Sequence, residues 1–259
     1  MAVRATVAGL LAALLAPILS AAPMPPKLPL KVMLIGDSLS VGPFGRALEA
    51  SLRRRYGDRG VGVFASCGSS PEDWLPGTPV FVTNCGYRQF AAGEVFSREY
   101  DNGRRPPPVK TPKLTALFAR YRPELIIVQL GTNWMDRLAA TRSLDGQSYR
   151  RIIRDFIREL RRGAGPGAAI VWVLPPASAQ YPAAVHEAVD GWLVAEAQAQ
   201  GFRTINSRAL TAPYVAGRTG ADGVHYSDGA GRRWARGVMT ALGPAPAPSL
   251  PLAPGALSR

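Results

Sequence analysis

Short apolar runs alternate with amphipathic stretches along most of the chain, and this alternation predicts a regular series of strands and helices. The strand-like runs are rich in branched residues and end at small or turn-forming residues. They lie at 31–35, 61–65, 125–130, 169–174 and 202–205. Between them, apolar residues recur at the spacing of helices that pack one face on a sheet. These expected helices lie at about 43–56, 112–121, 145–162, 182–200 and 228–242.

Strands that alternate with helices predict an α/β fold with a parallel sheet. The run 125–130 is apolar on both faces apart from Gln129, as expected for a central strand covered on both sides. Right-handed β-α-β connections then place consecutive strands side by side. We therefore expect a three-layer α/β/α sandwich around a five-stranded parallel sheet, flavodoxin-like, with strand order 2-1-3-4-5.

Residues 69–110 interrupt this rhythm. The segment is rich in proline, glycine and aromatic residues and has no clear periodicity, which is unusual for a connection of this length. It predicts an insert or lid within a single domain at 31–242. Its aromatic side chains could line a substrate cleft or simply fix the loop to the domain.

The two ends of the chain are unlike the rest. Residues 1–22 have one early arginine, an apolar run and small residues at 20–22, the pattern of a secretory signal peptide. The apolar run is short for a membrane span, which takes about 20 residues, although a retained anchor is the alternative. A Pro-rich linker follows at 23–30, and a Pro/Ala-rich tail at 243–259 is expected to be disordered. The protein is therefore expected to be secreted or periplasmic.

The chain contains two cysteines, Cys67 and Cys85. In an exported protein they are expected to form one disulfide, which would close a short loop. If the chain is not exported, buried thiols are the better interpretation.

The formal net charge is +13, and only four of the 31 basic residues are lysines. Such a charge permits an anionic partner, but many of the arginines fall on the outer face of the expected helix at 145–162, where a solvated surface explains them. We find no nucleic-acid-binding motif, zinc-type spacing or P-loop. The sequence therefore predicts no nucleic-acid partner, no metal and no cofactor, and after removal of the signal it predicts no integral membrane span.

A possible nucleophile stands where the first strand ends, in Gly36-Asp37-Ser38-Leu39. Alone, this tetrapeptide is more typical of a helix N-cap. A nucleophilic serine needs a base, and the base needs a group that orients it. Of the two histidines, His225 follows Asp222 by three residues in the loop before the last helix, whereas His186 lies near the start of a helix, where a structural role is more common.

Acyl transfer also requires donors for the oxyanion. The backbone N–H groups of Ser38 and Gly68 and the side-chain amide of Asn133 are candidates, because each follows an expected parallel strand at the same edge of the sheet. Their ordinary roles would be turn formation and helix capping.

Four short blocks in this order resemble those of the SGNH (GDSL-type) hydrolase family. They are Gly36-Asp37-Ser38-Leu39, the loop glycine Gly68, Gly131-Thr132-Asn133 and Asp222-x-x-His225. The resemblance implies that Ser38 is the nucleophile, His225 the base and acid, and Asp222 its orienting carboxylate. It also implies an oxyanion hole formed by Ser38, Gly68 and Asn133. The family's third block usually reads Gly-x-Asn-Asp, and Trp134 stands here in place of that aspartate.

The expected function is that of an exported serine esterase that removes acyl groups, O-acetyl in the first place, from a carbohydrate or cell-wall polymer. Trp74 and Trp134 are expected to bind the substrate by stacking. A lipase, thioesterase, lysophospholipase or acyltransferase with the same triad is one alternative, and a noncatalytic carbohydrate-binding envelope domain is another. The sequence leaves the acyl group and the oligomeric state open.

Overall fold

A computed structural model describes residues 27–100, 103–141, 145–215 and 222–244. The expected signal peptide at 1–22 and nearly all of the expected tail at 243–259 lie outside these residues. Strand β1 begins at Leu28, so the last part of the expected linker at 23–30 belongs to the sheet instead. Among the helices described, none has the length and apolar character needed to cross a membrane.

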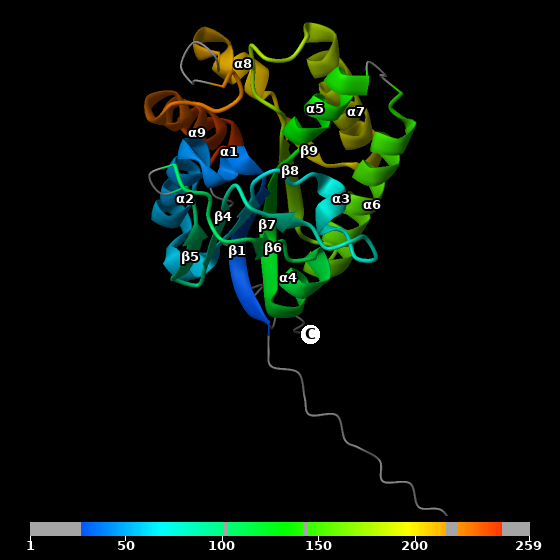
Figure 1. Cartoon of the computed structure of the whole chain (residues 1–259). Coiled ribbons are helices and arrows are strands. Elements are labelled where there is room, and N and C mark those ends of the chain that lie inside the picture. Colours follow the sequence, from blue (N-terminus) through cyan, green and yellow to red (C-terminus); the bar gives the residue numbers. More distant parts are fainter. Residues whose placement is uncertain (1–26, 101–102, 142–144, 216–221, 245–259) are drawn as a thin grey trace, which may run out of the picture.

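A sheet of seven strands runs through the described part of the chain in the order β5-β4-β2-β1-β7-β8-β9 (Figure 1). Its strands are β1 (Leu28–Gly36), β2 (Val61–Ser66), β4 (Tyr87–Ala91), β5 (Glu94–Arg98), β7 (Tyr121–Gln129), β8 (Ala169–Val173) and β9 (Arg203–Ile205). Strands β2, β1, β7, β8 and β9 are parallel neighbours, which confirms the predicted order. The expected total of five strands is wrong, because two antiparallel strands extend the sheet beyond β2.

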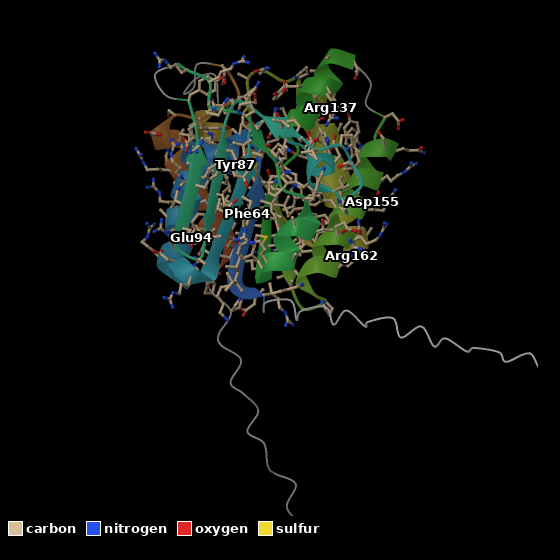
Figure 2. All side chains as sticks on the ribbon, turned by 60° about the horizontal axis from the view of Figure 1, so that its bottom comes forward. Phe64, Tyr87, Glu94, Arg137, Asp155 and Arg162 are labelled. Atoms are coloured by element: carbon tan, nitrogen blue, oxygen red, sulfur yellow. A yellow bond between two sulfur atoms is a disulfide. The ribbon has the colours of Figure 1, made fainter. Side chains whose placement is uncertain are left out.

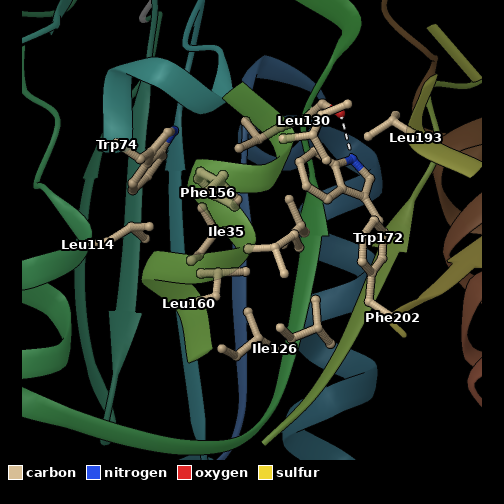
Figure 3. Packing of buried hydrophobic residues seen from close by; sticks show 14 of the residues in the cluster. Ile35, Trp74, Leu114, Ile126, Leu130, Phe156, Leu160, Trp172, Leu193 and Phe202 are labelled. Carbon is tan, nitrogen blue, oxygen red and sulfur yellow. Dashed lines mark hydrogen bonds between the residues drawn. The ribbon is translucent and has the colours of Figure 1, made fainter. Parts of the chain in front are cut away.

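Helices cover both faces of the sheet, as the predicted sandwich requires (Figure 1). The longer helices are α2 (Pro43–Tyr56), α4 (Leu114–Arg120), α5 (Thr132–Thr141), α6 (Gln147–Ala164), α7 (Ala183–Gln200) and α9 (Asp228–Leu242). Alternate residues of β1 point to opposite faces: Val32 packs with α2 and α9, and Met33 packs in the core with α4, α6 and α7. Figure 3 shows the core on the face of the sheet that α4, α6 and α7 cover, where Phe156 and Trp172 pack together.

The insert at 69–110 contains regular secondary structure that the sequence pattern did not predict. It contains the short helix α3 (Pro71–Trp74), the hairpin of β4 and β5, and a separate two-stranded sheet of β3 (Val82–Thr83) and β6 (Val109–Lys110). The hairpin turns at Ala92 and Gly93, which both have positive φ, as a two-residue type I′ turn requires. Figure 2 shows Tyr87 and Glu94 on this hairpin, beside the strand that carries Phe64. The predicted disulfide between Cys67 and Cys85 is present and ties the insert to the loop after β2.

Two short α-helices and two 3₁₀ turns complete the described chain. They are α1 (Ser38–Val41), the turn η1 (Asp58–Gly60), α8 (Ser207–Thr211) and the turn η2 (Ala212–Tyr214). Helix α1 follows β1 directly, and α8 follows β9. Both therefore begin at the carboxyl edge of the parallel strands.

Candidate active site

The register of the three central strands brings the candidate residues to one edge of the sheet. Gly36 at the end of β1 is level with Ala65 of β2 and with Gln129 of β7. Ser38, Gly68 and Asn133 therefore follow neighbouring strands at their carboxyl ends, where open α/β sheets bind ligands. This is the edge that the strand pattern predicted.

The turn that carries Ser38 is fixed from both sides. Asp37 is the N-cap of α1, and its Oδ1 accepts a hydrogen bond from Leu39 N at 2.9 Å. Ser40 Oγ donates to Gln129 Oε1 at 2.7 Å, which fastens the turn to the end of β7. A Cβ at Gly36 would lie 2.1 Å from Ser40 Oγ, so this approach requires glycine. Ser38 itself is partly exposed.

The Asp37 side chain is completely buried beneath this turn. Burial raises the pKa of its carboxyl group to about 6. The Leu39 N–H, the Gln129 amide, the charge of His225 and the Thr132 hydroxyl each counter part of that rise.

Asp222 and His225 form a tight pair in the loop before α9. His225 Nδ1 lies 2.5 Å from Asp222 Oδ2, and Asp222 Oδ1 accepts hydrogen bonds from the backbone N–H groups of Val224 and His225 at 3.0 and 2.8 Å. Partial burial acts to raise the pKa of Asp222, but these hydrogen bonds prevail and lower it to about 2. The carboxylate therefore stays ionised and fixes the orientation of the imidazole.

Packing between α2 and α9 brings the Ser38 turn and the His225 loop together. The rings of Phe44 and Trp234 stack with centroids 3.6 Å apart. A Cβ at Gly231 would lie 2.7 Å from Phe44 N, so the two helices are in close contact. In the part of the chain that the structure describes, no hydrogen bond joins Ser38 to His225. Such bonds often form only when substrate is bound, and the His225 side chain is 45% exposed.

The loop after β2 and the start of α5 are held against each other. Asn133 Nδ2 donates to Ser69 O at 2.8 Å, which leaves the second hydrogen of that amide without an acceptor among the described residues. Gly68, the residue before Ser69, has φ of 82°. Its N–H likewise has no acceptor in the described ranges, so both donors are free to bind an oxyanion.

Glu72 contacts two side chains of α5. Trp134 Nε1 donates to Glu72 Oε2 at 3.0 Å, and Arg137 pairs with Glu72 Oε1 at 2.5 Å. Arg137 also donates to Ser70 Oγ at 3.0 Å. These contacts fasten α5 to the loop that carries Gly68, and no sequence motif indicated them.

The expectation that Trp74 and Trp134 bind substrate by stacking is wrong. Both side chains are completely buried. Trp74 Nε1 donates to Ser69 Oγ at 3.1 Å, and Trp134 packs edge-on against Tyr149 with centroids 5.1 Å apart. Neither ring has a free face, so both support the loop of Gly68 and Ser69 from the core.

His186 is buried, in contrast to the exposed side chain of His225. It is 5% exposed, and burial lowers its pKa, with a further contribution from the charge of Arg208. Its ring packs edge-on against Tyr181 with centroids 5.9 Å apart. Among the residues that the structure describes, no group of three acidic, histidine or cysteine side chains could hold a metal ion.

Solved structures with similar folds were found, although no family model matches the chain and no curated protein matches its sequence. A structure titled TesA superposes with a TM-score of 0.54 at 18% identity, covering 83% of this chain and 99% of that one. An acetylxylan esterase from Geobacillus stearothermophilus gives 0.53 at 13% identity, with 82% and 94% covered. A lipase/acylhydrolase from Enterococcus faecalis gives 0.52 at 15% identity, with 82% and 95% covered. At these identities the likeness concerns the fold.

Proposed function

We propose that this chain, which has the SGNH hydrolase fold, is an exported serine esterase that removes O-acetyl groups from a carbohydrate or cell-wall polymer. One observation carries the reaction class. The Asp222–His225 pair, with its 2.5 Å contact, lies in a loop that bonds to Ser178 after the end of β8, at the edge of the sheet where Ser38, Gly68 and Asn133 follow β1, β2 and β7. A nucleophile, an oriented base and oxyanion donors are the parts that acyl transfer needs.

In the proposed reaction, His225 Nε2 takes the proton of Ser38 Oγ as the oxygen attacks the ester carbonyl. The oxyanion receives hydrogen bonds from Ser38 N, Gly68 N and Asn133 Nδ2. The intermediate collapses, and the alcohol leaves with the proton from His225. Water then attacks the acyl-enzyme by the same route, which releases the acid and restores Ser38. Asp222 holds Nδ1–H of the imidazole throughout and stabilises its charged form.

Three features support the substrate and the compartment. The disulfide between Cys67 and Cys85 is characteristic of proteins in oxidising compartments. One of the similar folds is that of an acetylxylan esterase, an enzyme of acetylated polysaccharide. The net charge of +13 favours association with anionic envelope polymers.

The experiment compares the release of acetate with the release of fatty acid by the purified protein. We expect acetate from acetylated xylan or O-acetylated peptidoglycan, and little fatty acid from lysophospholipid. Fatty acid release alone would replace the proposal with a lipase or lysophospholipase. Binding to either polymer without release of acetate would favour a noncatalytic carbohydrate-binding domain.

A further inference from the structure

Helix α5 carries a second polar side chain on the side where it bears Asn133. Asp136 follows Asn133 by three residues, so the two lie on the same face of the helix, one turn apart. Asp136 is exposed, whereas Leu138, two residues further along and on another side of the helix, is buried. An exposed carboxylate therefore stands one helical turn from the proposed oxyanion donor.

Tyr181 holds this carboxylate in place. Its hydroxyl donates to Asp136 Oδ1 at 2.8 Å, and its own side chain is only 7% exposed. The ring rests on His186, so the phenol has little freedom to move. One oxygen of Asp136 is thus fixed, and the other has no partner among the described residues.

The segment that carries Tyr181 also contacts the proposed acid–base loop. Ser178 Oγ donates to the carbonyl oxygen of Gly223 at 2.6 Å, and a Cβ at Gly223 would lie 3.4 Å from the Cβ of Gln180. Gly223 is the neighbour of Asp222. Tyr181 therefore lies between the helix of Asn133 and the loop of His225, and Asp136 stands at the rim of the site between them.

The electrostatic surroundings agree with this placement. Burial raises the pKa of the Tyr181 phenol, and its hydrogen bond to Asp136 and the charges of Asp136, Asp37 and Asp222 raise it further. The phenol therefore remains a donor at neutral pH. The charges that act on this hydroxyl include Asp222 of the proposed triad and Asp37, the neighbour of Ser38.

We propose that Asp136, oriented by Tyr181, binds a free hydroxyl group on the alcohol part of the ester, beside the acylated oxygen. An ionised carboxylate only accepts hydrogen bonds, so its ligand must carry donors. A neutral hydroxyl fits better than a cation, because the net charge of +13 repels cationic ligands. The preferred substrates would then be esters of polyols or sugars that keep a hydroxyl next to the ester. This inference rests on the proposed esterase function.

The test measures a ratio of kcat/KM for two substrates on one preparation. The first is a monoacetylated methyl glycoside with free neighbouring hydroxyls, and the second is p-nitrophenyl acetate, which has none. A hydrogen bond to a charged group is worth enough for Asp136→Ala to lower the ratio by about 10- to 100-fold. Because both rates come from the same sample, partial misfolding cannot change the ratio.

Two further variants define the interaction. Tyr181→Phe should lower the ratio by roughly 3- to 10-fold, since it removes the hydrogen bond that orients Asp136. Glu124→Ala is the matched control, because this exposed carboxylate pairs with Lys31 near the start of β7 and should leave the ratio unchanged.

Three results would overturn the inference. A ratio for Asp136→Ala within about twofold of the unmodified protein would remove Asp136 from substrate recognition. A selective loss with acetylcholine and none with the acetyl glycoside would assign the carboxylate to cations instead. If the unmodified protein hydrolyses neither ester and reacts with no fluorophosphonate, the esterase function itself fails and the subsite fails with it.

Discussion

Asn133 and Ser69 are joined by a hydrogen bond of 2.8 Å from the Asn133 amide to the Ser69 carbonyl oxygen. The contact links the first turn after β7 to the loop after β2, on either side of the strand that leads to Ser38. One side chain therefore both braces the loop of Gly68 and presents a free N–H group.

Replacement of Asn133 tests its role as an oxyanion donor. Asn133→Ala should lower kcat by about 10²- to 10³-fold, the usual effect of losing one such donor, with a smaller change in KM. Steady-state kinetics with p-nitrophenyl acetate measure the loss. Thr141→Ala at the far end of α5 is the control. A kcat within threefold of the unmodified protein would remove Asn133 from the oxyanion hole.

Trp134 should affect stability and leave substrate affinity unchanged. Trp134→Phe removes the hydrogen bond to Glu72 and leaves a gap in the core, so the free energy of unfolding should fall by about 1 to 3 kcal/mol. Urea unfolding measures this fall, and KM for an acetylated oligosaccharide should stay the same. A raised KM at unchanged stability would restore the stacking role that burial excludes.

The disulfide should contribute about 3 kcal/mol to the free energy of unfolding, as expected for a loop with a sequence separation of 18 residues. Urea unfolding with and without a reductant measures the difference. The double variant Cys67→Ala/Cys85→Ala is the control, since reductant should leave its midpoint unchanged. Equal midpoints for the oxidised and reduced protein would mean that the bridge adds nothing to stability.

Asp37 should make the protein less stable as the pH rises. Its pKa is about 6 in the folded chain against an ordinary 3.8, so between these values the folded state binds more protons than the unfolded state. Stability therefore falls as the pH rises through this window, by about 3 kcal/mol at 1.36 kcal/mol per pKa unit. Above pH 6 the penalty is constant.

The variant Asp37→Asn isolates this effect, since burial also raises the pKa of Asp190 to about 6 and adds to the pH dependence of the unmodified protein. The side-chain amide oxygen at position 37 of this variant can still accept the hydrogen bond from Leu39 N. Urea unfolding from pH 4 to 7.5 should show the variant gaining stability relative to the unmodified protein up to about pH 6. A difference that does not vary with pH would mean that Asp37 has an ordinary pKa.

The parallel strands and their order could be predicted because each is a compact apolar run, and right-handed connections allow few arrangements. The hairpin of β4 and β5 could not be predicted from the sequence. Its strands mix polar and apolar residues on both faces, and Ala92 occupies a turn position that Asn or Gly usually marks.

The proposed triad residues could be found because each follows a strand or precedes a helix in a recognisable block. The supporting contacts could not, since they join residues distant in sequence. Tyr181 and Asp136 are 45 residues apart, and Trp134 and Glu72 are 62 apart. The burial of Trp74 and Trp134 could not be predicted, because they lie on α3 and α5, two helices that the apolar pattern did not indicate.

Reaction of the folded protein with a fluorophosphonate probe, followed by identification of the labelled peptide, tests the central claim most directly. We predict one covalent adduct, on Ser38. The label should be absent from Ser38→Ala, strongly reduced in His225→Ala and retained in His186→Gln. A folded protein that takes no label, or an adduct on any residue other than Ser38, would contradict the account.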